Sequence, residues 1–322
     1  MQRGPTGRRR LLRRAGAAVA AIAAGGLAGC SGGASPDPDD TGGTGATATP
    51  TTVATSTPRP YEGPPYGRWV PDPSTLGRER VPFSAVDLAS MTVQGDTLPR
   101  GLRESPHVDG WQPVSVNWQD VTLSLWFRGN FVIVGDYDAG AVVDGVAETE
   151  GWRDVGDHAG YALLATEDRR RAVAVSDRAI VIGRSPGDGM TGVEAATTVI
   201  DTGRGFVPRL AVASDAVAAL VATVGDGSIV QWQPRDPPAT PAPSAGQFAG
   251  LVGLGRWGRV VDADTTHVKL VFVFADAAAA ERADLRAFVE ANREDGPLAA
   301  WTDLHVSSER RVGIVAGTIT RE

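Results

Sequence analysis

Two short segments of this sequence carry side chains that could coordinate a cation. One lies directly after the apolar run 131–134, and the other lies in the polar stretch that follows the next helical pattern. The candidate ligands are Asp136, Asp138, Asp154, Asp157 and His158. Carboxylate oxygens suit hard cations such as Ca²⁺, so a metal site would form if the two segments meet in the fold. The alternative is that Asp138 only caps the helix after it, on a surface where carboxylates are common.

Three other patterns carry weaker chemistry, and we expect none of them to bind a cofactor. The ranges 187–192 and 253–258 fit G-x-G-x-x-G, but with 40 glycines in 322 residues such matches occur by chance. The range 183–187 fits G-x-S-x-G around Ser185, yet the next residue is Pro186, which has no N–H for an oxyanion hole. The four histidines show no His-x-x-x-His or cysteine partner, so a zinc site is disfavoured. No catalytic residue is therefore predicted.

The stretch from Arg8 to Cys30 carries the clearest chemical signal. Arg8 and Arg9 precede two leucines and an apolar run of about 14 residues, an order that resembles a twin-arginine export signal. The run is shorter than the roughly 20 residues that span a bilayer, which favours a processed signal over an anchor helix. It ends in Leu-Ala-Gly-Cys, which resembles a lipobox, and Cys30 is the sole cysteine of the chain. We expect lipid attachment at Cys30.

Composition divides the rest of the chain. Residues 31–65 are rich in Gly, Ser, Thr, Pro and Asp, which predicts a disordered tether. Residues 1–30 hold six arginines and no acid, so removing them changes the net charge from −7 to −13. That acidity argues against nucleic-acid partners, which need basic surfaces. A proline-rich segment, 234–247, separates two folded ranges, 66–233 and 248–322, which we read as two units, with a shared sheet as the alternative.

The folded ranges mix strands and helices in an order that predicts an α+β protein with mostly antiparallel sheet and packed helices. A helix is expected over 84–91, strands over 114–127 and 131–134, and a helix over 139–150. A meander is expected over 161–183, with a short hairpin link at 176–178. The remaining expectations are helices over 193–200, 215–224 and 277–292, and strands over 228–232, 268–274, 302–306 and 311–319. Both ranges read as a strand, a helix, a tryptophan and antiparallel strands, which predicts a degenerate duplication of a split β-α-β unit.

The composition and one central segment resemble a known group of proteins. Lys269 is the single lysine among 31 basic residues, and an acidic, Arg- and Ala-rich chain behind this signal resembles secreted haloarchaeal lipoproteins. A GC-rich genome would also favour Arg over Lys. The segment 135–138, together with the core 172–183, is similar to uncharacterised haloarchaeal membrane-anchored lipoproteins. The resemblance implies an extracytoplasmic α+β domain and no catalytic motif.

These observations favour a lipoprotein at the outer face of the cell membrane that acts as a non-enzymatic binding or structural module. Its expected partners are the membrane, through the lipid on Cys30, and a cell-surface protein or glycan. Three tryptophans near the first strands, Trp111, Trp118 and Trp126, could stack against such a ligand, although core packing explains them as well. The alternative function is an extracellular hydrolytic enzyme whose active site the sequence does not identify.

Overall fold

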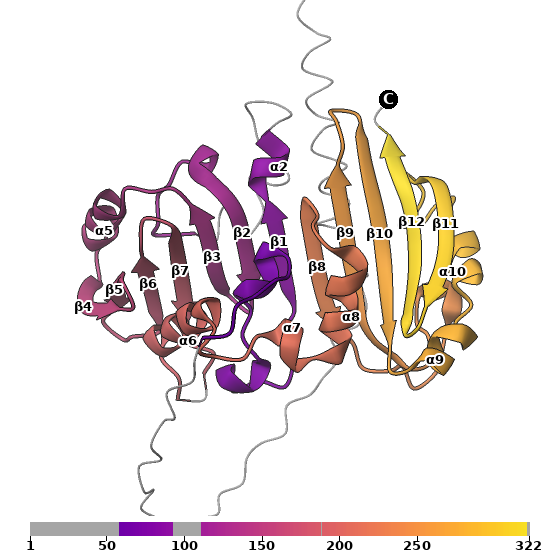
Figure 1. Ribbon diagram of the computed structural model, residues 1–322, viewed down its shortest axis with the longest axis horizontal. Coiled ribbons are helices and arrows are strands. Elements are labelled where there is room, and N and C mark those ends of the chain that lie inside the picture. Colours follow the sequence, from indigo (N-terminus) through magenta and orange to yellow (C-terminus); the bar gives the residue numbers. More distant parts are fainter. Residues whose placement is uncertain (1–57, 93–110, 188, 321–322) are drawn as a thin grey trace, which may run out of the picture.

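One antiparallel sheet organises the molecule (Figure 1). The computed structural model describes residues 58–92, 111–187 and 189–320, and within them the sheet has twelve strands. In spatial order the strands are β11 (Thr302–Glu309), β12 (Val312–Thr320), β10 (Thr265–Phe274), β9 (Leu251–Val260), β8 (Ile229–Pro234), β1 (Phe83–Asp87), β2 (Val121–Phe127), β3 (Asn130–Gly135), β7 (Ala179–Arg184), β6 (Arg171–Val175), β5 (Tyr161–Thr166) and β4 (Trp152–His158). The predicted α+β class with mostly antiparallel sheet is confirmed.

Helices cover both faces of the sheet. Their bounds are α2 (Leu88–Thr92), α5 (Ala139–Ala147), α6 (Gly192–Arg204), α7 (Leu210–Ala213), α8 (Asp215–Val224), α9 (Ala277–Arg282) and α10 (Leu285–Asn292), with short 3-10 turns η1 (Pro65–Arg68), η2 (Pro73–Leu76), η3 (Trp118–Asp120) and η4 (Pro243–Ala245). The helices α6, α7 and α8 bury their apolar residues on one face, seen in front in Figure 1. The helices α2, α5, α9 and α10 pack on the opposite face. Successive residues of the central strands therefore point to opposite faces of the sheet and pack into the core on each face, because the side chains of a strand alternate.

The proline-rich segment does not interrupt the sheet. Strand β8, before the segment, pairs with β9, after it, from Ile229 opposite Gly258 to Pro234 opposite Gly253. The two folded ranges predicted from composition thus contribute strands to one continuous sheet.

Three predicted assignments differ from the structure in whole or in part. The expected helix 84–91 is instead strand β1 followed by α2, because Phe83 and Ala85 face one core while Val86 faces the other. The expected strand 114–127 begins only at Val121. The expected helix 277–292 is broken into α9 and α10, where the Asp284 carboxylate accepts the Ala287 N–H at 3.0 Å and starts a new helix.

Two strands lack any counterpart among the predictions. The range 152–158, part of the polar stretch for which no strand is expected, is the edge strand β4, and the glycine motif 253–258 lies inside β9. Strand β4 is exposed at most positions after Trp152, so it shows no apolar alternation. In β9, glycines admit large neighbours: a Cβ at Gly253 would lie 1.8 Å from the Trp232 ring. Sequence periodicity cannot detect strands of either kind.

Other assignments are confirmed. The run 131–134 lies in β3 and is followed by α5, and the meander 161–183 forms β5, β6 and β7. Helix α8 begins with the Ser214 hydroxyl accepting the Val217 N–H at 3.4 Å. Among the helices of the described ranges, none has both the length and the apolar character needed to cross a membrane.

Candidate functional site: an arginine-lined cleft

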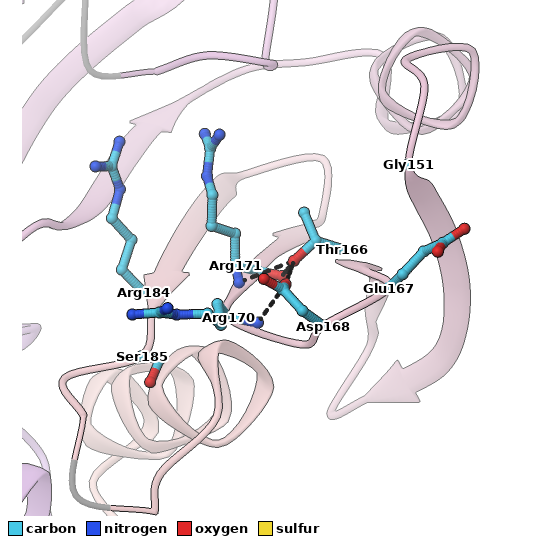
Figure 2. Close-up of a pocket in the computed structure, with 8 residues that line it drawn as sticks. All are labelled: Gly151, Thr166, Glu167, Asp168, Arg170, Arg171, Arg184 and Ser185. Atoms are coloured by element: carbon cyan, nitrogen blue, oxygen red, sulfur yellow. Dashed lines mark hydrogen bonds between the residues drawn. The ribbon is translucent and has the colours of Figure 1, made fainter.

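A broad cleft of about 640 Å³ opens where the turn between β5 and β6 meets the end of β7. Eight residues line it and are drawn in Figure 2: Gly151, Thr166, Glu167, Asp168, Arg170, Arg171, Arg184 and Ser185. Three of these residues are arginines. The volume lies within the range of small-molecule sites, roughly 300–1,000 Å³.

Arg171 and Arg184 lie directly opposite each other on neighbouring strands. The register of β6 and β7 pairs them, and the Ser185 N–H donates to the Arg170 carbonyl at 2.8 Å in the adjacent pair. The arginine pair therefore occupies a position without backbone hydrogen bonds, where opposing side chains approach most closely. Figure 2 shows the two side chains extending in the same direction. Like charges in this arrangement destabilise a sheet.

Aromatic rings support both guanidinium groups. Arg171 lies over the Trp152 ring at 5.4 Å and Arg184 over the Phe131 ring at 5.9 Å. Such cation–π contacts leave the edges of the planar group available for hydrogen bonding. An Nη atom of Arg171 also donates to the Gln112 carbonyl. Each of the two cations therefore lies against an aromatic ring.

Hydrogen bonding of the pair is incomplete. The Nε atoms of Arg171 and Arg184 are buried and have no hydrogen-bond partner among the residues that the structure describes. Burial lowers the pKa of Arg171, and the charge of Arg184 lowers it further. Arg171 nevertheless stays charged at neutral pH, because arginine is not deprotonated in proteins. The cleft therefore holds two partly desolvated positive charges beside each other.

The two acidic residues of the cleft bind groups other than the guanidinium groups of Arg171 and Arg184. Glu167 forms an ion pair with Arg153 on β4, and its side chain points away from the two guanidinium groups in Figure 2. The Asp168 carboxylate accepts the Thr166 hydroxyl at 2.7 Å and the Arg170 N–H at 3.0 Å. These hydrogen bonds lower the pKa of Asp168. Neither carboxylate forms a described ion pair with Arg171 or Arg184.

Ser185, the serine of the G-x-S-x-G pattern, lies at the rim of the cleft. Its hydroxyl donates to the Met190 carbonyl at 2.7 Å and accepts the Gly187 N–H at 3.3 Å. Its proton is thus bound to a backbone carbonyl and does not face a base. This serine closes a turn before α6.

The structure separates the two segments proposed to hold a cation. Strands β7, β6 and β5 lie between β3, which precedes Asp136 and Asp138, and β4, which carries the other three candidates. Asp138 caps α5 by accepting the Ala141 N–H at 3.0 Å, as the alternative reading predicted. Asp136 lies 4.0 Å from Arg178 in an exposed pair. No group of three or more His, Cys, Asp or Glu side chains is placed to hold a metal ion within the described ranges.

The candidates on β4 find different partners. His158 Nε2 lies 2.9 Å from the Asp201 carboxylate of α6. Asp154 accepts the Gly156 N–H at 2.7 Å within a bulge of the edge strand. Asp157 lies on the same strand, opposite Ala162. Arg8, Arg9 and Cys30 lie outside the described residues.

The three tryptophans pack on the face that also carries α5. Trp111 is 4% exposed, and Trp118 and Trp126 lie partly buried against the same core. A second cavity, of about 70 Å³, lies under α10 and is lined by apolar side chains that include Phe272, Phe288 and Trp301. It is small and offers mainly packing surface, so the arginine-lined cleft is the stronger candidate site.

Sequence reasoning missed Arg171 and Arg184, although a signal existed. The predicted hairpin link at 176–178 fixes the register of its two strands. With Ser176 opposite Ala179, that register places residue 171 opposite residue 184. Two arginines at facing positions of a buried hairpin are unusual enough to mark a site.

Comparison with known proteins adds little. No family model matches the chain, and no curated protein matches it. A solved structure titled "Structure of crystal form IV of TP0453" is similar, with a TM-score of 0.41 and 11% sequence identity over 78% of this chain and 93% of that one. A likeness this distant carries no argument about fold or function.

Proposed function

We propose that this chain is an exported lipoprotein, held at the outer face of the cell membrane by a lipid on Cys30, whose folded domain is a non-enzymatic binding module. The export part is supported by the order of Arg8, Arg9, the short apolar run and Cys30. Without the six arginines of residues 1–30 the net charge is −13, and this acidic composition resembles that of secreted haloarchaeal lipoproteins.

The paired arginines carry the binding part of the proposal. The two arginines face each other across β6 and β7, and the nearby carboxylates bind other groups. Keeping two cations side by side costs stability, so a fold that retains them is expected to use them for a ligand. Hydrolysis would also need a nucleophile beside a base, whereas the Ser185 hydroxyl donates to a carbonyl. The geometry therefore favours binding over the hydrolytic alternative.

Membrane attachment is tested by fractionating cells that express the full chain. In the Cys30→Ser variant we expect the protein to leave the membrane fraction and appear in the medium, because the thiol that would carry the lipid is gone. A Ser31→Ala variant is the matched control and should stay with the membrane. Retention of Cys30→Ser in the membrane fraction would contradict the proposal.

Export is tested separately with the arginine pair. Replacing Arg8 and Arg9 by lysines preserves charge but removes the twin-arginine signal, so the unprocessed chain should accumulate in the cytoplasm. Normal processing of that variant would argue for a different export route.

We also propose that the sheet arose by duplication. Support comes from the strand order: β1, β2 and β3 are followed in space by β7, and β8, β9 and β10 are followed by β12. A helical segment follows β3 and another follows β10, and β1 pairs antiparallel with β8, as a two-fold axis perpendicular to the sheet requires. Superposition of residues 83–184 on residues 229–320 in an experimental structure is the test, and a poor fit of these strands would count against duplication.

A further inference from the structure

We propose that the Arg171–Arg184 pair binds a phosphate monoester or inorganic phosphate. The inference rests on the proposed binding role of the folded domain, and it does not depend on the lipid anchor. The ligand class follows from the charge, the hydrogen-bonding capacity and the size of the cleft.

Charge favours a dianion. The facing guanidinium groups contribute two positive charges and Arg170, which also lines the cleft, contributes a third. Glu167 is paired with Arg153, and Asp168 is bound within its own turn. A carboxylate would neutralise one of the two cations. A phosphate monoester carries about −1.5 to −2 charges near neutral pH and neutralises both.

Hydrogen bonding also favours phosphate, because its tetrahedral oxygens can accept from both planar guanidinium groups. The Nε atoms of both arginines are buried, so a ligand in the cleft would meet the terminal Nη atoms of the two groups. The rings of Trp152 and Phe131 each lie close to one of the two guanidinium groups. A guanidinium group donates two parallel hydrogen bonds to a phosphate, and a phosphate has enough oxygens to accept from Arg171 and Arg184 at once. Binding would also remove the repulsion between the two cations.

The shape of the cleft leaves room for more than phosphate alone. Its volume of about 640 Å³ exceeds what a phosphate group needs. The phosphate could therefore be free, or belong to a soluble ester, or belong to a lipid headgroup. These sources share the same chemistry at Arg171 and Arg184, so the experiment must separate them.

The test uses the purified full-length Cys30→Ser chain in calorimetric titrations. Inorganic phosphate should bind, and acetate at matched ionic strength should bind at least tenfold more weakly. Arg184→Gln should weaken phosphate binding by roughly 10- to 100-fold, because one charge-assisted donor group is lost. Arg178→Gln removes the same charge from an exposed position at the other end of the β6–β7 hairpin and should bind as the parent chain does.

A second measurement guards against variants that do not fold. Phosphate should raise the melting temperature of the parent chain and of Arg178→Gln, since a ligand that binds the native state stabilises it. Arg184→Met keeps apolar contact with Phe131 and removes one of two facing cations, so without phosphate it should melt no lower than the parent chain. With phosphate it should show no rise.

The lipid source is separated by co-sedimentation with vesicles. Binding to phosphatidate in phosphatidylcholine vesicles, lost in Arg184→Gln, would place the phosphate on a lipid. Phosphate binding without vesicle binding would assign a soluble ligand. The inference is overturned if the parent chain binds no phosphate at millimolar concentration, if acetate binds equally well, or if Arg184→Gln and Arg178→Gln behave alike. These outcomes leave the test of membrane attachment through Cys30 unaffected.

Discussion

Replacing Gly183 by alanine should loosen the contact between α6 and β7 next to the arginine-lined cleft. A Cβ at Gly183 would lie 2.2 Å from the Gly192 carbonyl oxygen and 2.7 Å from the Ala196 backbone nitrogen. Both neighbours are backbone atoms of α6, so no side chain can rotate away. The helix must shift by roughly 1 Å, and such overpacking costs about 1–3 kcal/mol or more.

The expected loss is near the upper end of that range. Ala196, Val199 and Ile200 of α6 are fully buried, so a shift of the helix disturbs the whole of its apolar face. We expect urea denaturation of the full chain to show a loss of about 3 kcal/mol in the free energy of unfolding. The melting temperature should fall by roughly 6–12 °C for a domain of this size.

Gly145→Ala is a control in which the free energy of unfolding should rise instead of fall. Gly145 lies on the exposed side of α5, and a Cβ there meets nothing within 4 Å. Gly145→Ala should therefore stabilise the chain by about 1 kcal/mol through helix propensity. The packing argument fails if Gly183→Ala and Gly145→Ala change the free energy of unfolding in the same direction. Because Arg184 follows Gly183, we also expect Gly183→Ala to weaken phosphate binding.

Two further predictions concern α6 and the overall charge. Thr191→Ala removes the hydroxyl that accepts the Glu194 N–H at 3.1 Å, which should lower the free energy of unfolding by about 1 kcal/mol. Separately, the Thr191 N–H and hydroxyl donate to the Glu194 carboxylate and lower the pKa of Glu194. The stabilisation from these two hydrogen bonds is present above the ordinary carboxyl pKa and is lost as pH falls through the lowered value. Thr191→Ala removes only the hydroxyl, so NMR titration should show a higher pKa for Glu194 in this variant, and an unchanged pKa would refute the coupling. Residues 31–322 carry a net charge of −13, so the melting temperature of this part of the chain should rise between 0.1 and 2 M KCl as repulsion is screened. A melting temperature that does not depend on salt would favour genome composition over a halophilic surface as the origin of the acidity.

The parts of the fold that sequence predicted are those with local signals. Strand β3 is an apolar run, and α8 has both a Ser214 cap and a glycine at its end. The meander β5 to β7 has short polar links between apolar segments. In each case a few neighbouring residues determine the element, so no knowledge of distant contacts is needed.

The missed elements depend on contacts far apart in the chain. Strand β1 lies between β2 and β8, and its residues Phe83 to Val86 are buried on both faces. Burial of this kind removes the alternation that distinguishes a strand from a short helix. The two folded ranges share a sheet because β8 pairs with β9 across the proline-rich segment, which composition alone cannot show.

The candidate site also shows the difference between features set by neighbouring residues and features set by distant contacts. Asp138 was read correctly as a possible cap because capping is local, whereas the cation site required two segments to meet, and three strands separate them. Arg171 and Arg184 are thirteen positions apart and look like ordinary charged strand ends until the hairpin register pairs them. Two facing arginines could still be solvated surface side chains without a ligand. What makes it a candidate site is the combination of an aromatic ring near each guanidinium group and carboxylates that bind elsewhere. Each of these features comes from a different element, so the site follows from the assembled sheet and from no single motif.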